Sequence, residues 1–223
     1  MKFLGKDIKA VICDMDGTLI DSTGIWGQID IDFFKKRGFD KVPEEYNQMI
    51  VHCGLQQGAA MTIERYGFVN DTVEGIIQEW RNASLAQYKD VIPLKPNALE
   101  LLNLFKDSGV KIALATANDK ELYEPCLKRL NILSYFDYII DVDKVKIGKS
   151  SPKIFNTVSD FFGIKPEETL VLEDSLMGLK TAKEAGYITV GVDDDLSKAN
   201  VNEKKKESYL YITDFEQLIK ALN

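Results

Sequence analysis

The stretch KAVICDMDGTLIDS, residues 9–22, decides the fold and raises the question of function. Its first part is apolar and typical of a buried β-strand, yet Asp14 and Asp16 stand two residues apart directly after it. A carboxylate at the end of a buried strand contributes nothing to a hydrophobic core and is costly to remove from water. The two aspartates therefore indicate a functional site at the end of this strand.

The composition is that of an ordinary globular protein. The chain has 223 residues, 45% of them hydrophobic, which is enough for one sizeable core and a second small domain or large insertion. The net charge of −7 argues against nucleic acid as the main partner. No stretch approaches the ~20 apolar residues of a membrane span, and the N-terminus lacks the apolar core of a signal peptide. We therefore expect a cytoplasmic protein with no nucleic-acid or membrane partner, whose one basic run, EKKKE at 203–207, is a solvated face.

The cysteines do not indicate a disulfide framework or a zinc site. Cys13, Cys53 and Cys126 are far apart and form no C-x-x-C pair. We expect reduced and mostly buried thiols.

Short β-rich runs alternate with helical patterns over most of the chain. The runs are IKAVIC (8–13), VKIALAT (110–116), FDYIID (136–141), TLVLED (169–174), YITVGV (187–192) and YLYI (209–212). Strands that alternate with helices in this way predict a parallel β-sheet.

The region 21–87 has a different texture. It contains no convincing strand, and four helical stretches follow one another, punctuated at Gly38, Pro43, Gly54 and Gly67. This predicts a helical domain inserted directly after the first strand, far longer than a simple crossover helix requires. The alternative is an enlarged crossover that only adds to the core.

Polar residues follow three of the predicted strands at their carboxyl ends, the edge at which open parallel sheets bind ligands. They are Asp14 and Asp16, Thr116 and Asn118, and Glu173 and Asp174.

Converging carboxylates at this edge require a cation. Two unit negative charges ~4 Å apart repel by roughly 4 kcal/mol at an effective dielectric constant of 20. A pair such as Asp14 and Asp174 therefore predicts a bound divalent ion, and oxygen ligands with few carboxylates suit Mg²⁺. Lys149 adds a fixed positive charge. A carboxylate nucleophile, a divalent cation and a lysine together indicate phosphoryl transfer.

Four motifs in order resemble those of the haloacid dehalogenase superfamily, and most closely its subgroup of β-phosphoglucomutase and phosphoglycolate phosphatase-like enzymes. The motifs are DMDGT (14–18), Thr116, Lys149 before SSPKIF (150–155), and LEDS (172–175) with Gly178. The resemblance implies a Rossmann-like, doubly wound parallel sheet core formed by residues 1–20 and 88–223. It also implies that residues 21–87 form a helical cap domain.

The resemblance also implies roles for the site residues. Asp14 attacks phosphorus and forms an aspartyl-phosphate, and Asp16 protonates the leaving alcohol and then activates water. Mg²⁺ is held by Asp14, the backbone carbonyl of Asp16 and Asp174. The phosphoryl group is bound by Thr116, Ala117, Asn118 and Lys149. Two roles stay open for Glu173, which either orients metal-bound water or is simply exposed.

The expected substrate is a small phosphorylated metabolite, handled by a monomer. Asp16 favours phosphate esters, because the dehalogenases of the superfamily lack this second aspartate. The mutases use a cap histidine and a cap arginine, and aligned by motif this chain has Trp26 and Gln57 there. Glutamine lacks the cationic grip of arginine on a second phosphate, so a phosphatase is favoured over a sugar-phosphate mutase. Trp26 is either a pocket residue or cap core, and a binding protein that does not turn over substrate is the alternative outside enzymes.

Overall fold

The computed structural model describes residues 1–46, 49, 55–118, 120–141, 149–194 and 200–222. The strands are β1 Lys2–Phe3, β2 Lys6–Asp7, β3 Ala10–Cys13, β4 Lys111–Thr116, β5 Tyr138–Asp141, β6 Thr169–Glu173, β7 Ile188–Val192 and β8 Leu210–Ile212. The helices are α1 Thr23–Lys36, α3 Leu55–Tyr66, α4 Val73–Asp90, α5 Ala98–Asp107, α6 Lys120–Arg129, α8 Lys153–Phe162, α9 Leu176–Glu184, α10 Val201–Lys206 and α11 Phe215–Ala221, with 3₁₀ turns at Leu133–Tyr135 and Pro166–Glu168.

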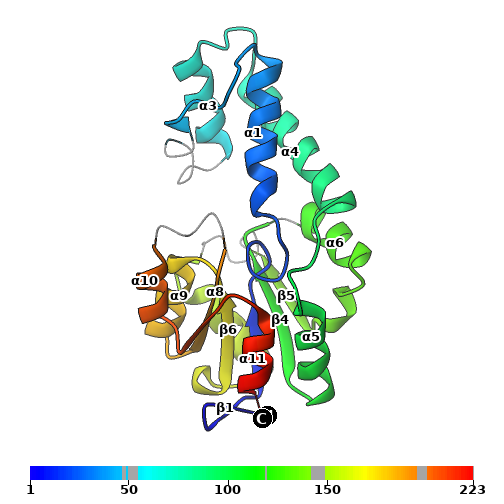
Figure 1. Cartoon of the computed structure of the whole chain (residues 1–223), viewed down its shortest axis with the longest axis vertical. Helices are drawn as coiled ribbons and strands as arrows, with labels where there is room; N and C mark the ends of the chain where they lie inside the picture. Colours follow the sequence, from blue (N-terminus) through cyan, green and yellow to red (C-terminus); the bar gives the residue numbers. More distant parts are fainter. Residues whose placement is uncertain (47–48, 50–54, 119, 142–148, 195–199, 223) are drawn as a thin grey trace. The chain divides into compact units, whose positions relative to one another are not determined.

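Six parallel strands form one sheet in the order β5-β4-β3-β6-β7-β8 (Figure 1). Each of the six β-rich runs supplies one of these strands, so the predicted parallel sheet is confirmed. Strand β3 lies between β4 and β6, and the order reverses there, as in other doubly wound α/β folds. The stretch at 9–22 thus places its aspartates at the reversal point.

Burial on both faces explains why the strands are continuous apolar runs rather than alternating ones. Every residue of β3 and of β7 is buried. Ile12, Ala113 and Val171 face the same core cluster as Ile154 and Phe155 of α8. Helix α11 contacts α5 and β8, and in Figure 1 it lies in front of the sheet, whereas α8 and α9 lie behind it.

The chain divides into two compact units. One comprises Met1–Thr23 and Ile92–Asn223 and contains the sheet, and the other comprises Gly24–Val91 and is helical. The chain leaves the first unit after Thr23 and returns to it at Ile92. The segments next to these points are paired inside the first unit: Ile20 forms a β-bridge with Leu94, and the Asp21 amide donates to the Pro93 carbonyl at 3.0 Å.

Helices α1, α3 and α4 build the helical unit around an aromatic core of its own. The buried members are Ile29, Phe33, Phe34, Tyr46, Ala59, Phe68, Ile76 and Trp80. Helix α4 begins at Thr72, whose side chain accepts a hydrogen bond from the Gly75 amide, a standard N-cap. Of the four helical stretches expected from the sequence, the one between Pro43 and Gly54 falls largely outside the described residues. Trp26 packs partly buried against the aromatic core, as in the cap-core alternative.

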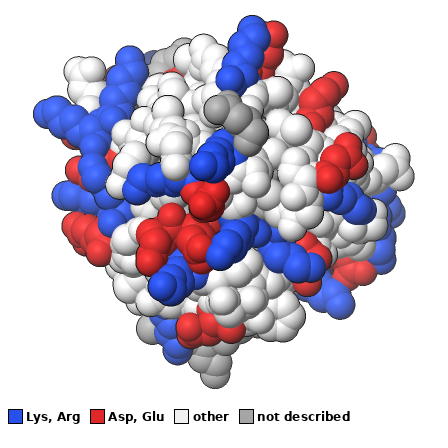
Figure 2. All heavy atoms as spheres, turned by 90° about the horizontal axis from the view of Figure 1, so that it is seen from below, with Lys and Arg blue, Asp and Glu red and all other residues white. Residues whose placement is uncertain are grey.

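The surface shown in Figure 2 carries Lys and Arg interspersed with Asp and Glu. On this face the positive charges are mixed with negative ones, whereas a face that binds nucleic acid usually carries clustered positive charge. Among the helices of the described residues, none is long and apolar enough to cross a membrane. Cys13 and Cys126 are free and buried as expected, and Cys53 lies outside the described residues.

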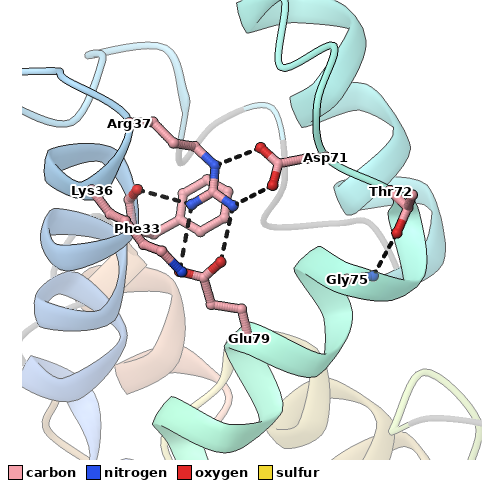
Figure 3. Close-up of polar contacts among 7 residues, drawn as sticks. All are labelled: Phe33, Lys36, Arg37, Asp71, Thr72, Gly75 and Glu79. Atoms are coloured by element: carbon pink, nitrogen blue, oxygen red, sulfur yellow. Dashed lines mark hydrogen bonds and ion pairs between the residues drawn. The ribbon is translucent and has the colours of Figure 1, made fainter.

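Arg37 ties the parts of the helical unit together (Figure 3). Its guanidinium donates to both carboxylate oxygens of Asp71 at 2.8 and 2.9 Å, to Glu79 at 2.9 Å and to the Phe33 carbonyl at 3.1 Å. It also lies over the Phe33 ring, 3.7 Å from the ring centroid. The Arg37 side chain is only 10% exposed, so this planar, multiply bonded cation is a structural element of the unit.

We predict that Arg37→Met lowers the free energy of unfolding of the helical unit by about 2–3 kcal/mol, because Asp71 loses its bidentate partner and Glu79 is left with the exposed Lys36 at 3.1 Å. Arg37→Lys recovers little, since an ammonium cannot form the fork. Arg65→Met is the matched control: Arg65 and Glu45 form an exposed pair at 3.3 Å, and its loss costs less than about 1 kcal/mol. Urea unfolding measures both, and equal losses would contradict the assignment.

Asp30 is a buried carboxyl on α1. Burial raises its pKa from 3.8 to about 7. The charge of Asp30 contributes to a raised pKa of Tyr46, a buried phenol. The folded protein therefore binds a proton at Asp30 that the unfolded chain has released between about pH 4 and pH 7.

A folded pKa above the unfolded value means that stability falls as the pH rises from about 4 to about 7. We expect Asp30→Asn to remove this fall, on the order of 2–4 kcal/mol at pH 8. Asp32→Asn, at an exposed position on the same helix, is the control. Unfolding free energies measured between pH 4 and 8 isolate the Asp30 contribution, because wild type and Asp30→Asn share all other titrating groups. Parallel pH curves for wild type and Asp30→Asn would refute it.

Candidate active site

The polar residues expected at the sheet edge follow three adjacent strands. Asp14 follows β3, Thr116 ends β4, and Glu173 ends β6 with Asp174 next to it. Asp14, Thr116 and Glu173 are buried. The carboxyl ends of neighbouring parallel strands meet at one edge, so the reversal of strand order at β3 brings these side chains to one place.

Lys149 bridges two of the carboxylates. Its ammonium donates to Asp14 Oδ1 and, at 2.8 Å, to Glu173 Oε2. Burial alone would lower the Lys149 pKa, but the charges of Asp14 and Glu173 outweigh burial and raise it. Lys149 therefore stays charged and compensates the acidic residues.

Asp14, Glu173 and Asp174 each offer a carboxylate oxygen within 4.8 Å of the others. Burial, together with the neighbouring negative charges, raises the pKa of Asp14 and of Asp174 above the ordinary value for an aspartate. Carboxylates held this close favour a cation, and an all-oxygen donor set is the kind that Mg²⁺ binds. The residues present thus fit a hard divalent ion.

Glu173 is held by protein donors at both carboxylate oxygens. Oε2 accepts from Lys149, and Oε1 accepts from the Ser175 hydroxyl at 2.7 Å and the Ser175 amide at 3.1 Å. Only 1% of the residue is exposed, so the expectation that it is simply exposed is wrong. A Cβ at Gly178 would lie 2.5 Å from Glu173 Cδ, which explains the glycine of the LEDS motif. Both carboxylate oxygens of Glu173 thus have protein donors, and through Oε2 Glu173 helps to hold Lys149 in place.

Gly17 lets Asp174 approach the turn after β3. Its φ of +73° is in the left-handed region, and a Cβ there would lie 2.7 Å from Asp174 Oδ2. The Thr18 hydroxyl donates to Asp174 Oδ1 at 3.2 Å. Gly17 and Thr18 of the first motif therefore form the binding surface against which the Asp174 carboxylate packs.

Asn118 connects the second motif to the first. Its amide side chain donates to Asp16 Oδ2, and its backbone amide donates to Thr116 Oγ1 at 3.1 Å. Asp16 is partly exposed and Ala117 is exposed, whereas Thr116 is fully buried. The structure thus groups Asp14 with Lys149, Glu173 and Asp174, and Asp16 with Asn118 and Thr116.

Three further residues lie behind the site and were missed from the sequence. Asp194 is 5% exposed and forms an ion pair with Lys95 at 2.9 Å. Lys204 is fully buried, and its ammonium donates to the Asp174 carbonyl at 3.0 Å. The expected solvated face at 203–207 is therefore wrong at Lys204, because one side of the short helix α10 faces the protein interior. Asp194 follows β7 at the same sheet edge, a position that could have been noticed; no local signal marks the two lysines.

This fold and site define a class: a doubly wound α/β protein with buried carboxylates and a lysine at the strand reversal, suited to an anionic substrate and a divalent cation. The sequence profile of the haloacid dehalogenase-like hydrolases matches residues 8–186, and the chain belongs to that family.

Several proteins to which the chain is similar are named as phosphatases. The phosphorylated carbohydrates phosphatase of Thermotoga maritima is 28% identical over 179 residues, covering 80% of this chain and 82% of the relative. Hexitol phosphatase B of Escherichia coli K12 is 25% identical over 182 residues, covering 81% of each. A β-phosphoglucomutase-like crystal structure from Thermotoga maritima superposes with a TM-score of 0.80 at 26% identity, covering 96% of this chain and 97% of that one. The chain is thus a haloacid dehalogenase-like hydrolase, as the motifs predicted, and it is similar to members of the subgroup that the motifs resemble.

We expect Mg²⁺ to raise the melting temperature, and we predict that Gly17→Ala abolishes this rise while leaving the protein folded, because the new methyl displaces the Asp174 carboxylate. The matched control is Gly109→Ala, where φ is +69° but nothing lies within 4 Å of the added methyl. Both variants carry the same backbone strain, about 1–2 kcal/mol, and only one carries the clash. Thermal melts with and without Mg²⁺ compare them. If Mg²⁺ raises the melting temperature of Gly17→Ala as much as that of the wild type, the position of Asp174 next to Gly17 is not needed for binding the cation.

Proposed function

We propose that the protein is a Mg²⁺-dependent phosphatase that hydrolyses a small-molecule phosphomonoester through an aspartyl-phosphate on Asp14. The observation that carries the proposal is the buried Asp14 at the strand reversal, paired with Lys149 and next to Asp174. Relatives named as phosphatases of phosphorylated carbohydrates and hexitols support the substrate class.

Asp14 is the nucleophile in this proposal. Burial raises the pKa of Asp14, and the ammonium of Lys149, which donates to the Asp14 carboxyl group, acts in the opposite direction. Lys149 thus favours the carboxylate, which attacks phosphorus where a neutral acid does not. Asp14, the Asp16 carbonyl and Asp174 would hold Mg²⁺, which when bound would supply positive charge toward the phosphate oxygens.

Asp16 is the general acid and base. Its partial exposure lets it reach a substrate oxygen, and the Asn118 amide fixes its carboxylate by hydrogen bonding to Oδ2. Asp16 gives a proton to the leaving alcohol and then takes one from the water that hydrolyses the intermediate. Thr116, Ala117, Asn118 and Lys149 bind the phosphoryl oxygens.

Hydrolysis is favoured over the mutase reaction, which stays the alternative. Gln57 is exposed on α3 at the position where the mutases have a phosphate-gripping arginine. A mutase must retain a bisphosphorylated intermediate, which neutral amides hold weakly. We assign residues 21–87 as the cap that selects the substrate, and we infer a monomer that acts on a small phosphorylated metabolite in the cytoplasm.

Phosphate release from a panel of sugar, polyol and nucleoside monophosphates, with and without Mg²⁺, tests the proposal. We expect metal-dependent release that Asp14→Asn reduces by at least about 10³-fold with the fold unchanged. Asp107→Asn, at an exposed position at the end of α5, is the control. A fully active Asp14→Asn would exclude the nucleophile. Conversion of β-glucose 1-phosphate to glucose 6-phosphate without free phosphate would establish the mutase.

Asp16→Asn separates the two half-reactions. With p-nitrophenyl phosphate, whose leaving group needs no proton, we expect Asp14 to be phosphorylated while its hydrolysis slows by about 10²–10⁴-fold. The phosphorylated protein should therefore accumulate, and acid quenching followed by mass analysis detects it. Equal slowing of both steps without accumulation would contradict the role of Asp16.

A further inference from the structure

A second layer of charge lies behind the carboxylates of the site. The Lys95 ammonium donates to Asp194 Oδ2 at 2.9 Å and to the Asp193 carbonyl at 2.8 Å. The side chains of Lys95 and Asp194 are 14% and 4% exposed, so this ion pair is largely shielded from solvent. Neither residue belongs to the four motifs.

The carboxyl groups of Asp194 and Asp174 both lie close to Gly17. The position of a Cβ on Gly17 would be 2.7 Å from Asp174 Oδ2 and 3.2 Å from Asp194 Cγ, so both carboxyl groups pack against the same glycine. The charge of Asp194 acts on Asp174, and without a nearby cation the two would repel strongly in a shielded place. Asp194 is thus a fixed negative charge beside the proposed cation ligand.

Lys95 is held in place from both ends. Its backbone amide donates to the Leu19 carbonyl at 2.9 Å, and the preceding Leu94 bridges Ile20. Leu19 and Ile20 belong to the turn that carries Gly17. The turn that carries Gly17 therefore holds the backbone of Lys95. The Lys95 ammonium in turn neutralises Asp194, which packs against that glycine.

Lys204 adds a second buried ammonium on the same side, bonded to the Asp174 carbonyl. Within the described residues, the negative charges of Asp174, Asp193 and Asp194 act on Lys204, as does the positive charge of Lys95. Loss of either lysine would make this region more negative.

We propose that Lys95 is a positioning residue whose ammonium neutralises Asp194 beside Asp174 and thereby sets the balance between divalent-cation and phosphate binding at the site. The inference rests on the proposed function, because it takes Asp174 as the cation ligand. A positively charged ion and a phosphate dianion respond in opposite directions to an added negative charge. Removal of the Lys95 charge should strengthen binding of the cation and weaken binding of phosphate.

The test is calorimetric titration with Mg²⁺ alone, and with inorganic phosphate at saturating Mg²⁺. For Lys95→Met we expect Mg²⁺ to bind about tenfold more tightly and phosphate about tenfold more weakly. For Asp194→Asn both shifts should have the opposite sign. The double variant should return both dissociation constants toward the wild-type values.

The matched control is Lys111→Met. Lys111 pairs with Asp137 at 3.0 Å at the opposite end of β4, and its loss should change neither dissociation constant. If Lys95→Met does not fold, the reversed shifts in Asp194→Asn still decide the question. Weakening of both ligands in both single variants would show a purely structural brace and overturn the proposal, as would unchanged constants.

The outcome is separable from that of the proposed function, because Mg²⁺ and phosphate binding are read without turnover. Failure of the wild type to release phosphate, with the opposite shifts intact, would refute the phosphatase and keep the role of Lys95. Normal turnover lost in Asp14→Asn, with no opposite shifts, would refute only the role of Lys95.

Discussion

The structure depends on one electrostatic constraint: several carboxylates are buried together at the edge of a parallel sheet. Asp14, Glu173 and Asp174 lie where backbone strands end, and charges of one sign in a shielded place are unstable without partners. Lys149 meets part of this demand by bonding to two of them. The close approach of Asp14 and Asp174 fits a bound divalent cation, as proposed above.

The same constraint explains residues that carry no charge. Gly17 and Gly178 each remove a Cβ that would overlap a carboxylate, at 2.7 Å from Asp174 and 2.5 Å from Glu173. Ser175 caps helix α9 and also donates to Glu173, so one side chain begins a helix and orients an acid. The motif glycines and the motif serine are therefore required by the packing of the acids.

The sequence is informative about the fold and the centre of the site because both are encoded locally. Each strand is one continuous apolar run, and Asp14 and Asp174 follow such runs directly, so strand ends locate them without knowledge of distant contacts. The contacts of Lys95 and Lys204 form only through tertiary packing. Lys95 and its partner Asp194 are about 100 residues apart in the sequence. Lys204 and Asp174 are 30 residues apart. Lys204 even stands in a run that looks solvated. Glu173 could not be decided from the sequence, because its burial depends on Gly178 and Lys149 together.

The charges of the site divide into two sets with different consequences. Lys149 contacts Asp14, the proposed nucleophile, so its charge bears on whether Asp14 is ionised. Lys95 and Lys204 contact the carbonyl and carboxylate groups around Asp174 and bear on the cation. A site that must hold a cation and a dianion together cannot be optimised for either alone, since added negative charge favours one at the expense of the other. Fixed lysines, one in contact with Asp14 and others in contact with groups around Asp174, suit this compromise.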